Sequence, residues 1–435
     1  MHVAIVTAGG AGMFCGSCMH DNTLARALHR VGCEVSLIPT YTPVRVDEEN
    51  LSSRAVQLGG INMYLDHAVP LWNRLPRWMT RWLDSPRVIS MATRFGVSND
   101  AARLGPLTLD LLRGMDGPNR REIREFVDDL CLRLQPDLIC FSNALLSGTI
   151  PYLRQRYDGP LVCLLQGDDI FLDGLPPPYR EQAIELIRSN SRGFNRFLAH
   201  SEYYRNHMTR QLGLDGNRCG QMTLGIDLDG HDGMAEERNN SGFTVGYFAR
   251  ICPEKGLHHL VEAMALLKNR HAEVRLLAAG YLGKRDARWF RLLEQTASRQ
   301  LGTAFRYCGS PATHADKVQF LKSIDILSVP TEYREPKGLY VLEALANGTP
   351  VVQPAHGAFP ELIERTGGGL LIPPGDPVAL ADSLEQLLLD QERRLAFARN
   401  GQVAVRESFG LESLGHEAAV LFRNMIAAGP EGSDN

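Results

Sequence analysis

The feature that most restricts the fold of this chain is the alternation of short apolar runs with amphipathic helical segments, in two halves of similar layout. The first half begins with the apolar run 2–7, a glycine-rich loop and a helical segment from Asn22. The second begins with the apolar run 243–248, a loop to Gly256 and a helical segment through Leu267. Alternation of this kind is typical of parallel strands that helices cover on both faces. The sequence therefore predicts an α/β fold with two Rossmann-like, doubly wound domains.

A polar, glycine-containing stretch at residues 230–242 separates the two halves. The chain has 435 residues, which suits two domains of ordinary size. We expect an N-terminal domain over residues 1–229 and a C-terminal domain over residues 243–405. A final segment, at about 406–428, predicts a helix because its apolar residues recur on one stripe.

Two carboxylates, Glu335 and Glu343, flank a Pro-Lys-Gly break at residues 336–338. The apolar run before the break predicts a strand, and the apolar spacing after it predicts a helix. Glu335 is then expected in a loop at the carboxyl edge of the sheet, and Glu343 in the second helical turn. The amides of Gly338 and Leu339 would lie at the helix N-terminus, where unpaired N–H groups attract anions. Two acids for hydroxyl groups with a phosphate between them predict a nucleotide-sugar site.

Two cations, Arg250 and Lys255, follow the first strand of the second half. Transfer from a nucleoside-diphosphate sugar releases a diphosphate whose growing negative charge must be neutralised. Fixed cations at the carboxyl edge of the sheet can do this without a metal, so we expect both side chains to contact the diphosphate. Both pairs of residues also have a purely structural alternative. Arg250 and Lys255 could be solvated charges on a loop. Glu335 and Glu343 could belong to a surface helix whose acidic residues only suit the helix dipole.

At these residues the chain resembles the retaining glycosyltransferases of family 4, which have the GT-B fold. The resemblance lies in Glu335, seven intervening residues, Glu343 and the Asn-Gly-Thr-Pro-Val-Val stretch at 347–352, and it extends over about 243–387. It implies two Rossmann-like domains with an inter-domain cleft. It also implies a C-terminal cross-over helix, residues 406–428 here, that packs back on the first domain.

The resemblance further implies an enzyme of carbohydrate biosynthesis, a hexosyl-type transferase that acts with retention at the anomeric carbon. Its co-substrate would be a UDP-, GDP- or ADP-linked sugar, with no other cofactor and no metal, and its acceptor a carbohydrate or a lipid-linked molecule. The residues expected in catalysis are Glu335, Arg250, Lys255 and Gln166; in donor binding Glu343, Gly338, Leu339, Gly16 and Lys337; and in acceptor binding Ser17, Asp168 and Asp169.

Two positions depart from the family pattern. Gln166 stands where the family commonly has a His that reaches the transferred sugar; a Gln can hydrogen-bond a hydroxyl but carries no charge. Asp168 and Asp169, just beyond it, are either acceptor ligands or solvated loop acids. Lys337 stands where an aromatic residue is more common, and it either signals a donor with a carboxylate or only points outward.

The glycine-rich loop of the first half, at residues 9–20, could have several functions. Its glycine spacing does not match a dinucleotide fingerprint. Cys15 and Cys18 form a C-x-x-C pair, which could be half a zinc site or a redox pair, but no second pair of suitable spacing follows. By resemblance, Gly16 lies where the family has a glycine that faces the donor phosphate and the acceptor.

Trp72, Trp78 and Trp82 alternate with arginines in one segment of the first half. A basic, aromatic helix of this kind can make a peripheral membrane contact and bring the enzyme to a lipid-linked acceptor. The tryptophans can equally pack on the first domain, line the acceptor site or contact a protein partner.

Composition and local sequence argue against several classes of protein. A formal net charge of −4 argues against a general nucleic-acid binder. Nine scattered cysteines suit a reducing cytoplasm. The N-terminus reads as a first strand rather than a signal peptide, and no apolar run approaches the roughly 18 residues that a spanning helix needs. We therefore expect a cytoplasmic protein, with membrane association only at the cytoplasmic face.

Other functions fit parts of the sequence. A nucleotide-sugar epimerase of the same fold would convert a donor without an acceptor. The Gln at position 166 also allows a catalytically silent nucleotide-sugar-binding protein. A nicotinamide dehydrogenase is disfavoured because the fingerprint is missing.

Overall fold

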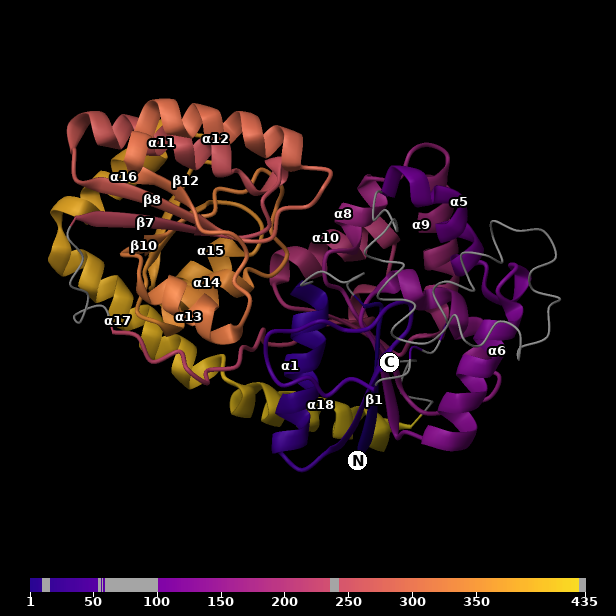
Figure 1. Ribbon diagram of the computed structural model, residues 1–435. Helices are drawn as coiled ribbons and strands as arrows, with labels where there is room; N and C mark the ends of the chain where they lie inside the picture. Colours follow the sequence, from indigo (N-terminus) through magenta and orange to yellow (C-terminus); the bar gives the residue numbers. More distant parts are fainter. Residues whose placement is uncertain (10–15, 54–55, 57, 59–100, 235–241, 430–435) are drawn as a thin grey trace. The chain divides into compact units, whose positions relative to one another are not determined.

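The computed structural model describes residues 1–9, 16–53, 56, 58, 101–234 and 242–429. The chain divides into two compact units, Met1–Thr223 with Leu414–Asn435, and Leu224–Ser413. Each unit is built around its own six-stranded sheet (Figure 1). The segment with Trp72, Trp78 and Trp82 lies outside the described residues.

The first unit contains a parallel sheet in the strand order β2-β1-β3-β4-β5-β6. Strand β1, which lies inside the sheet between β2 and β3, is apolar and buried from Val3 to Val6, as a strand covered on both faces requires. The strands are β1 (His2–Thr7), β2 (Glu34–Pro39), β3 (Leu138–Phe141), β4 (Leu161–Leu164), β5 (Arg196–Ala199) and β6 (Cys219–Gln221). The α-helices among the described residues of this unit are α1 (Gly16–Arg30), α5 (Ala101–Leu112), α6 (Arg120–Asp128), α7 (Ile150–Leu153, a single turn), α8 (Asp168–Asp173), α9 (Tyr179–Asn190), α10 (Glu202–Leu212) and α18 (Leu411–Ala428).

Helix α18 packs against α1 within the first unit, and the two are adjacent in Figure 1. The contact is close because Gly415 has no side chain: a Cβ there would lie 2.3 Å from the Ala27 carbonyl oxygen. The Glu417 side chain accepts a hydrogen bond from the Thr223 N–H at 3.1 Å. The expected final helix at 406–428 is in fact divided, because α17 (Gln391–Ser408) ends before α18 begins.

The second unit contains a parallel sheet in the order β12-β11-β10-β7-β8-β9. In Figure 1, α11 and α12 lie on one face of this sheet and α13 and α14 on the other. The strands are β7 (Phe243–Phe248), β8 (Val274–Ala279), β9 (Phe305–Tyr307), β10 (Ile326–Leu327), β11 (Val351–Pro354) and β12 (Gly369–Ile372). The helices are α11 (Leu257–Arg270), α12 (Ala287–Leu301), α13 (His314–Lys322), α14 (Leu339–Ala346), α15 (Phe359–Thr366), α16 (Pro377–Leu389) and α17.

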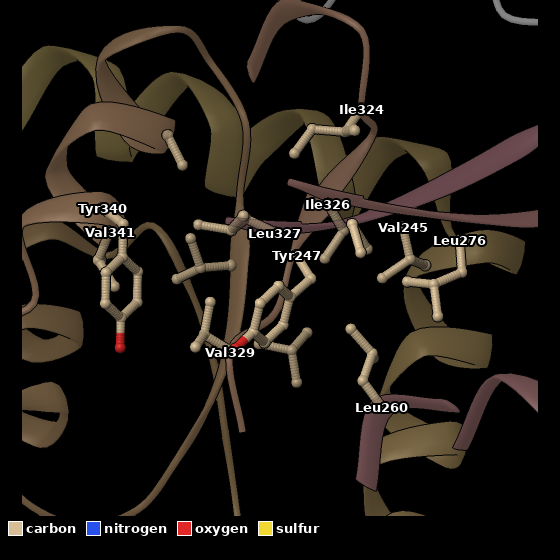
Figure 2. Close-up of a cluster of buried hydrophobic side chains, with 14 of the residues drawn as sticks. Val245, Tyr247, Leu260, Leu276, Ile324, Ile326, Leu327, Val329, Tyr340 and Val341 are labelled. Atoms are coloured by element: carbon tan, nitrogen blue, oxygen red, sulfur yellow. The ribbon is translucent and has the colours of Figure 1, made fainter. Parts of the chain in front are cut away.

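Strand β10 is shorter than its apolar run suggests. The Val329 N–H donates at 3.3 Å to the side-chain oxygen of Gln353, in the neighbouring strand β11, instead of to a backbone carbonyl, and Pro330 follows. The core nevertheless continues past the strand: Figure 2 shows side chains of β7, β8, β10, α11 and α14 packed together with Ile324 and Val329. Their burial holds the loop after β10 rigidly on the sheet.

Each sheet has a switch point, where the strand order reverses. In the first unit β1 lies between β2 and β3, and in the second unit β7 lies between β8 and β10. In open parallel sheets, ligands bind outside the carboxyl ends of the strands at such points. The loops after β1, β3, β7 and β10 are therefore the places to look for chemistry.

Among the described residues, no helix combines the length and the apolar character that crossing a bilayer demands. Of the eight described cysteines, only Cys308 is exposed, Cys131 is half-buried and the other six are buried.

Candidate functional site

The second unit brings two of the expected site residues into direct contact. Lys255 ends a short 3-10 turn (Pro253–Lys255) that follows β7, and Glu335 lies in the loop that follows β10. The Lys255 Nζ lies 2.6 Å from the Glu335 Oε2, although the residues are 80 positions apart. Both side chains are largely buried, at 12% and 8% exposure.

Two tyrosines complete the surroundings of this ion pair. The hydroxyls of Tyr333 and Tyr340 each donate to Glu335 Oε2 at 3.1 Å. The Lys255 ammonium also lies over both rings, 4.7 Å and 5.2 Å from their centroids. Glu335 therefore accepts three charge-assisted or phenolic hydrogen bonds, and Lys255 has cation–π contacts besides its ion pair.

These contacts keep Glu335 ionised. Burial alone would raise the pKa of the Glu335 carboxyl, but the charge of Lys255 and the three hydrogen bonds outweigh it and lower that pKa below its ordinary value. Burial and the Glu335 carboxylate raise the pKa of Tyr333 well above its ordinary value, while the charge of Arg250 acts in the opposite direction. Arg250 thus lies close enough to this cluster to act on it electrostatically.

The N-terminus of α14 lies just beyond this cluster. Gly338 is its N-cap residue, with a φ of 82°, and a Cβ there would lie 2.8 Å from the Leu362 side chain. A left-handed φ and a close neighbour both favour glycine. The helix begins at Leu339 as expected. Lys337, beside it, is buried, so the outward-pointing alternative for this side chain is wrong.

Glu343 belongs to a second, separate ion pair. Its Oε1 lies 2.8 Å from the Nζ of Lys317 on α13, and both side chains are buried. Asn347 donates to the Glu343 carbonyl at 3.0 Å and lies 2.7 Å from the Nδ1 of His231. Burial and the charge of Lys317 lower the pKa of His231 to about 3, so its ring is neutral.

The loops after β7 and β10 approach each other at a glycine. Gly256, directly after Lys255, has a φ of 73°, and a Cβ there would lie 1.8 Å from the Pro330 carbonyl oxygen. No larger residue fits this contact. The approach brings Lys255 within reach of Glu335.

In the first unit, Gln166 follows β4 at the carboxyl edge of the sheet. Its side-chain nitrogen donates to Asp21 Oδ1 at 2.8 Å and to the Ser142 carbonyl at 3.0 Å. Ser17, in the first turn of α1, donates from its Oγ to the Gln166 carbonyl at 3.3 Å. Gly16 is the exposed first residue of the same helix. Both hydrogens of the Gln166 side-chain amide form hydrogen bonds within the protein. Donation to a sugar hydroxyl would therefore require one of these two hydrogen bonds to break.

Asp168 and Asp169 are buried rather than solvated. Asp168 accepts from the backbone N–H groups of Ala144 at 2.7 Å and Gln166 at 3.0 Å, and burial raises its pKa to about 6. Asp169 accepts from the Tyr204 hydroxyl at 2.7 Å, and that hydroxyl accepts from the Gly167 N–H at 2.8 Å. These contacts hold the loop that carries Gln166; acceptor binding by either aspartate stays a prediction.

Cys15 lies outside the described residues, and Cys18 is a buried cysteine in α1. Three residues that the structure places in the two ion-pair clusters had no role in the sequence prediction. Tyr333 and Tyr340 lie in the same segment as Glu335, so their proximity could have been inferred. Lys317 lies 26 positions before Glu343 and has no local signal.

Comparison with known proteins bears on the second unit. Residues 234–404 match the model of the family "Glycosyl transferases group 1". This range contains Lys255, Glu335 and Glu343. Over these residues the chain is therefore similar to the group 1 glycosyltransferases.

Curated relatives align with less than half of this chain. D-inositol 3-phosphate glycosyltransferase of Corynebacterium urealyticum is 31% identical over 44% of this chain and 45% of its own length. The enzyme of the same name from Salinispora tropica is 34% identical over 37% of this chain and 34% of its own length. A lipopolysaccharide core biosynthesis mannosyltransferase of Rhizobium meliloti is 30% identical over 42% of this chain and 52% of its own length. The chain thus spans about a third to a half of the length of these relatives.

Solved structures extend the likeness to both units. Sucrose-phosphate synthase of Thermosynechococcus elongatus has a TM-score of 0.73 at 19% identity and covers 98% of this chain and 100% of its own. Anabaena HepE, in complex with UDP, has a TM-score of 0.66 at 17% identity, with coverage of 98% and 100%. The fold is therefore GT-B, as the sequence resemblance predicted.

Proposed function

We propose that this protein is a glycosyltransferase that moves a sugar from a nucleoside-diphosphate sugar to an acceptor with retention of anomeric configuration. The observation that carries the proposal is the Lys255–Glu335 ion pair at the switch point of the second unit, which is similar to the group 1 glycosyltransferases. A buried, ionised carboxylate bound to a buried lysine is costly to keep. Its position at the ligand-binding edge of the sheet supports a catalytic role.

The proposed roles of the site residues follow from the charges of their side chains. Lys255 and Arg250 would neutralise the charge that grows on the diphosphate as the glycosidic bond breaks. A diphosphate would compete with Glu335 for the Lys255 ammonium, which frees the carboxylate to accept from sugar hydroxyls. The amides of Gly338 and Leu339 would contact the phosphate, because the N-terminus of α14 offers unpaired N–H groups. Lys337 would add positive charge beside the sugar.

Glu343 would bind the ribose hydroxyls, and its ion pair with Lys317 would hold the carboxylate in place for that purpose. In the first unit, Gly16, Ser17 and Gln166 would take part in binding the acceptor and the transferred sugar. Hydrogen bonds from Gln166 to Asp21 and Ser142 fix this side chain in place. No other cofactor is included in the proposal.

The test begins with the donor. Purified protein is heated with UDP-, GDP- and ADP-sugars, and with free nucleotides as controls; a ligand that binds only the folded state raises the unfolding midpoint. The double variant Lys255→Met/Glu335→Gln removes both charges together, so that neither is left buried alone. We expect one class of donor to stabilise the wild type and the double variant to lose that effect. Absence of stabilisation by every nucleotide sugar would contradict the proposal.

Turnover and stereochemistry need a second measurement. The donor identified above is incubated with pools of sugar and lipid-linked acceptors, and the anomeric configuration of the product is read by NMR. Retention in the product supports the full proposal, and inversion would refute that part of it. Conversion of the donor without any acceptor would instead favour an epimerase.

A further inference from the structure

Three potential metal ligands converge beside the loops of the candidate site. His258 and His259 are in the first turn of α11, and Glu332 is in the loop that follows β10. The Nε2 atoms of the two histidines lie 2.9 Å and 3.2 Å from the same oxygen, Glu332 Oε1. All of these ligand atoms lie within 4.8 Å of one another.

These separations are close to those of a tetrahedral metal centre. Zn–N and Zn–O bonds of about 2.0–2.1 Å at tetrahedral angles place neighbouring ligand atoms about 3.3 Å apart. The two N···O separations here are shorter than that by less than half an ångström. Small rotations of the side chains would therefore open the cluster enough for an ion. The side chains are 25%, 19% and 50% exposed, so solvent can reach the cluster.

Neighbouring groups hold the cluster in place. The His258 and His259 rings lie 4.0 Å apart, and the Trp289 ring packs edge-on against His258 at 6.0 Å. The backbone N–H of Glu332 donates to the Glu254 carbonyl at 3.0 Å, which ties the loop to the turn before α11.

The electrostatics also suit a cation. Arg285 lies nearby but pairs with Glu254 at 3.3 Å and with Asp286 at 3.2 Å. Its positive charge is thus balanced by other carboxylates.

We propose that His258, His259 and Glu332 form a binding site for a divalent transition-metal ion, with Zn²⁺ the best match. Two imidazoles and a carboxylate suit zinc, and three protein ligands leave a fourth position for water or another group. The ion would link the first turn of α11, which begins two residues after Lys255, to the loop that carries Glu335. The site is distinct from the proposed donor contacts and does not depend on the proposed function.

We expect moderate affinity. Metal-bound histidines normally donate their other ring N–H to an acceptor, and loss of that partner typically costs about 10–100-fold in affinity. The Nδ1 atoms of both histidines are buried without a hydrogen-bond partner among the described residues. Binding should therefore be micromolar rather than nanomolar.

The experiment measures Zn²⁺ affinity by competition with a chromophoric chelator, on full-length protein without a histidine tag. Wild-type protein should bind one ion per chain in the micromolar range. His258→Ala/His259→Ala should bind at least about 100-fold more weakly, since loss of ligands exceeds loss of their outer partners. His271→Ala is the matched control, because His271 contacts Glu385 at 2.6 Å and belongs to no group of three possible metal ligands within the described part of the chain. Its affinity should not change.

Co²⁺ provides a second readout, since tetrahedral Co²⁺ has strong visible absorption bands that octahedral Co²⁺ lacks. Glu332→Gln provides a second variant in case the double alanine variant does not fold, because its side chain is half exposed. It should weaken binding and reduce the bands. Equal zinc affinity in wild type and in the histidine or Glu332→Gln variants would overturn the proposal, as would wild-type protein that binds no zinc in the micromolar range.

Discussion

At the scale of single residues, the candidate site depends on buried charges that are each neutralised by a partner. Glu335 is matched by Lys255 and Glu343 by Lys317. Removal of one member leaves the other as an unpaired buried charge, which costs far more than removal of both. Stability and function are therefore coupled at these positions.

A first prediction concerns the Lys255–Glu335 pair. Lys255→Met should lower the free energy of unfolding by about 3–5 kcal/mol, because Glu335 is left ionised and buried. Addition of Glu335→Gln should recover much of that loss. Urea unfolding of both single variants and the double variant measures the coupling. Additive losses in the double variant would show that the two side chains do not form a pair in solution.

A second prediction concerns Asp168, whose pKa is raised by burial to about 6 from an ordinary value of 3.8. Between these values the folded state binds more protons than the unfolded state. Its stabilising contribution is therefore complete below pH 4 and is lost as the pH rises through about 6, a change of about 3 kcal/mol at 1.36 kcal/mol per pKa unit. Asp168→Asn cannot titrate, so it should remove this part of the pH dependence. Unfolding titrations from pH 4 to pH 7 measure both curves; parallel curves would contradict the assignment.

At the scale of elements, two loops of the second unit are held together by close backbone contacts as well as by the Lys255–Glu335 ion pair. The turn that precedes α11 and the loop that follows β10 meet where Gly256 approaches Pro330. Figure 2 shows that the residues beneath, from β7, β10, α11 and α14, form one apolar cluster. Packing against this core keeps the two loops rigid, and the rigid loops hold Lys255 and Glu335 in position.

A third prediction follows from this contact. Gly256→Ala should destabilise the second unit by more than the roughly 1–2 kcal/mol that left-handed backbone costs an alanine, because its Cβ would clash with the Pro330 carbonyl. Gly375→Ala is the control, since Gly375 has a similar φ of 69° and no atom within 4 Å of a Cβ. Equal urea midpoints for the two variants would mean that the loops can separate at no cost.

At the scale of the whole molecule, the two units have separate cores. The larger apolar cluster draws its buried residues from Leu224 to Phe409, and the other from Ala4 to Cys219. Each core lies within one of the two units. Each unit thus meets the requirement of a domain, a sheet with its own buried apolar faces.

A fourth prediction is that residues 224–413 fold alone. The fragment retains its full sheet and core, so it should unfold in one cooperative urea transition and keep the nucleotide stabilisation seen with the full chain. Circular dichroism and the thermal-shift assay measure these properties. A fragment without a cooperative transition would show that its core needs the rest of the chain.

Local sequence determined the elements and their order. Apolar runs such as the one in β7 and the break before α14 were predictable, because periodicity and turn chemistry act over a few residues. The same local pattern brought Glu335, Gly338 and Glu343 into one loop and helix, and through the family resemblance it predicted the GT-B fold.

Only the tertiary structure decided which of these groups touch. Strand β10 lies beside β7 although nearly 80 residues separate them, and that adjacency brings Lys255 to Glu335. Lys317 reaches Glu343, and Gln166 reaches Asp21, through other long-range contacts. Such pairings depend on strand order and on the close approach of distant loops, which the packing of the whole sheet sets and no short stretch of sequence encodes.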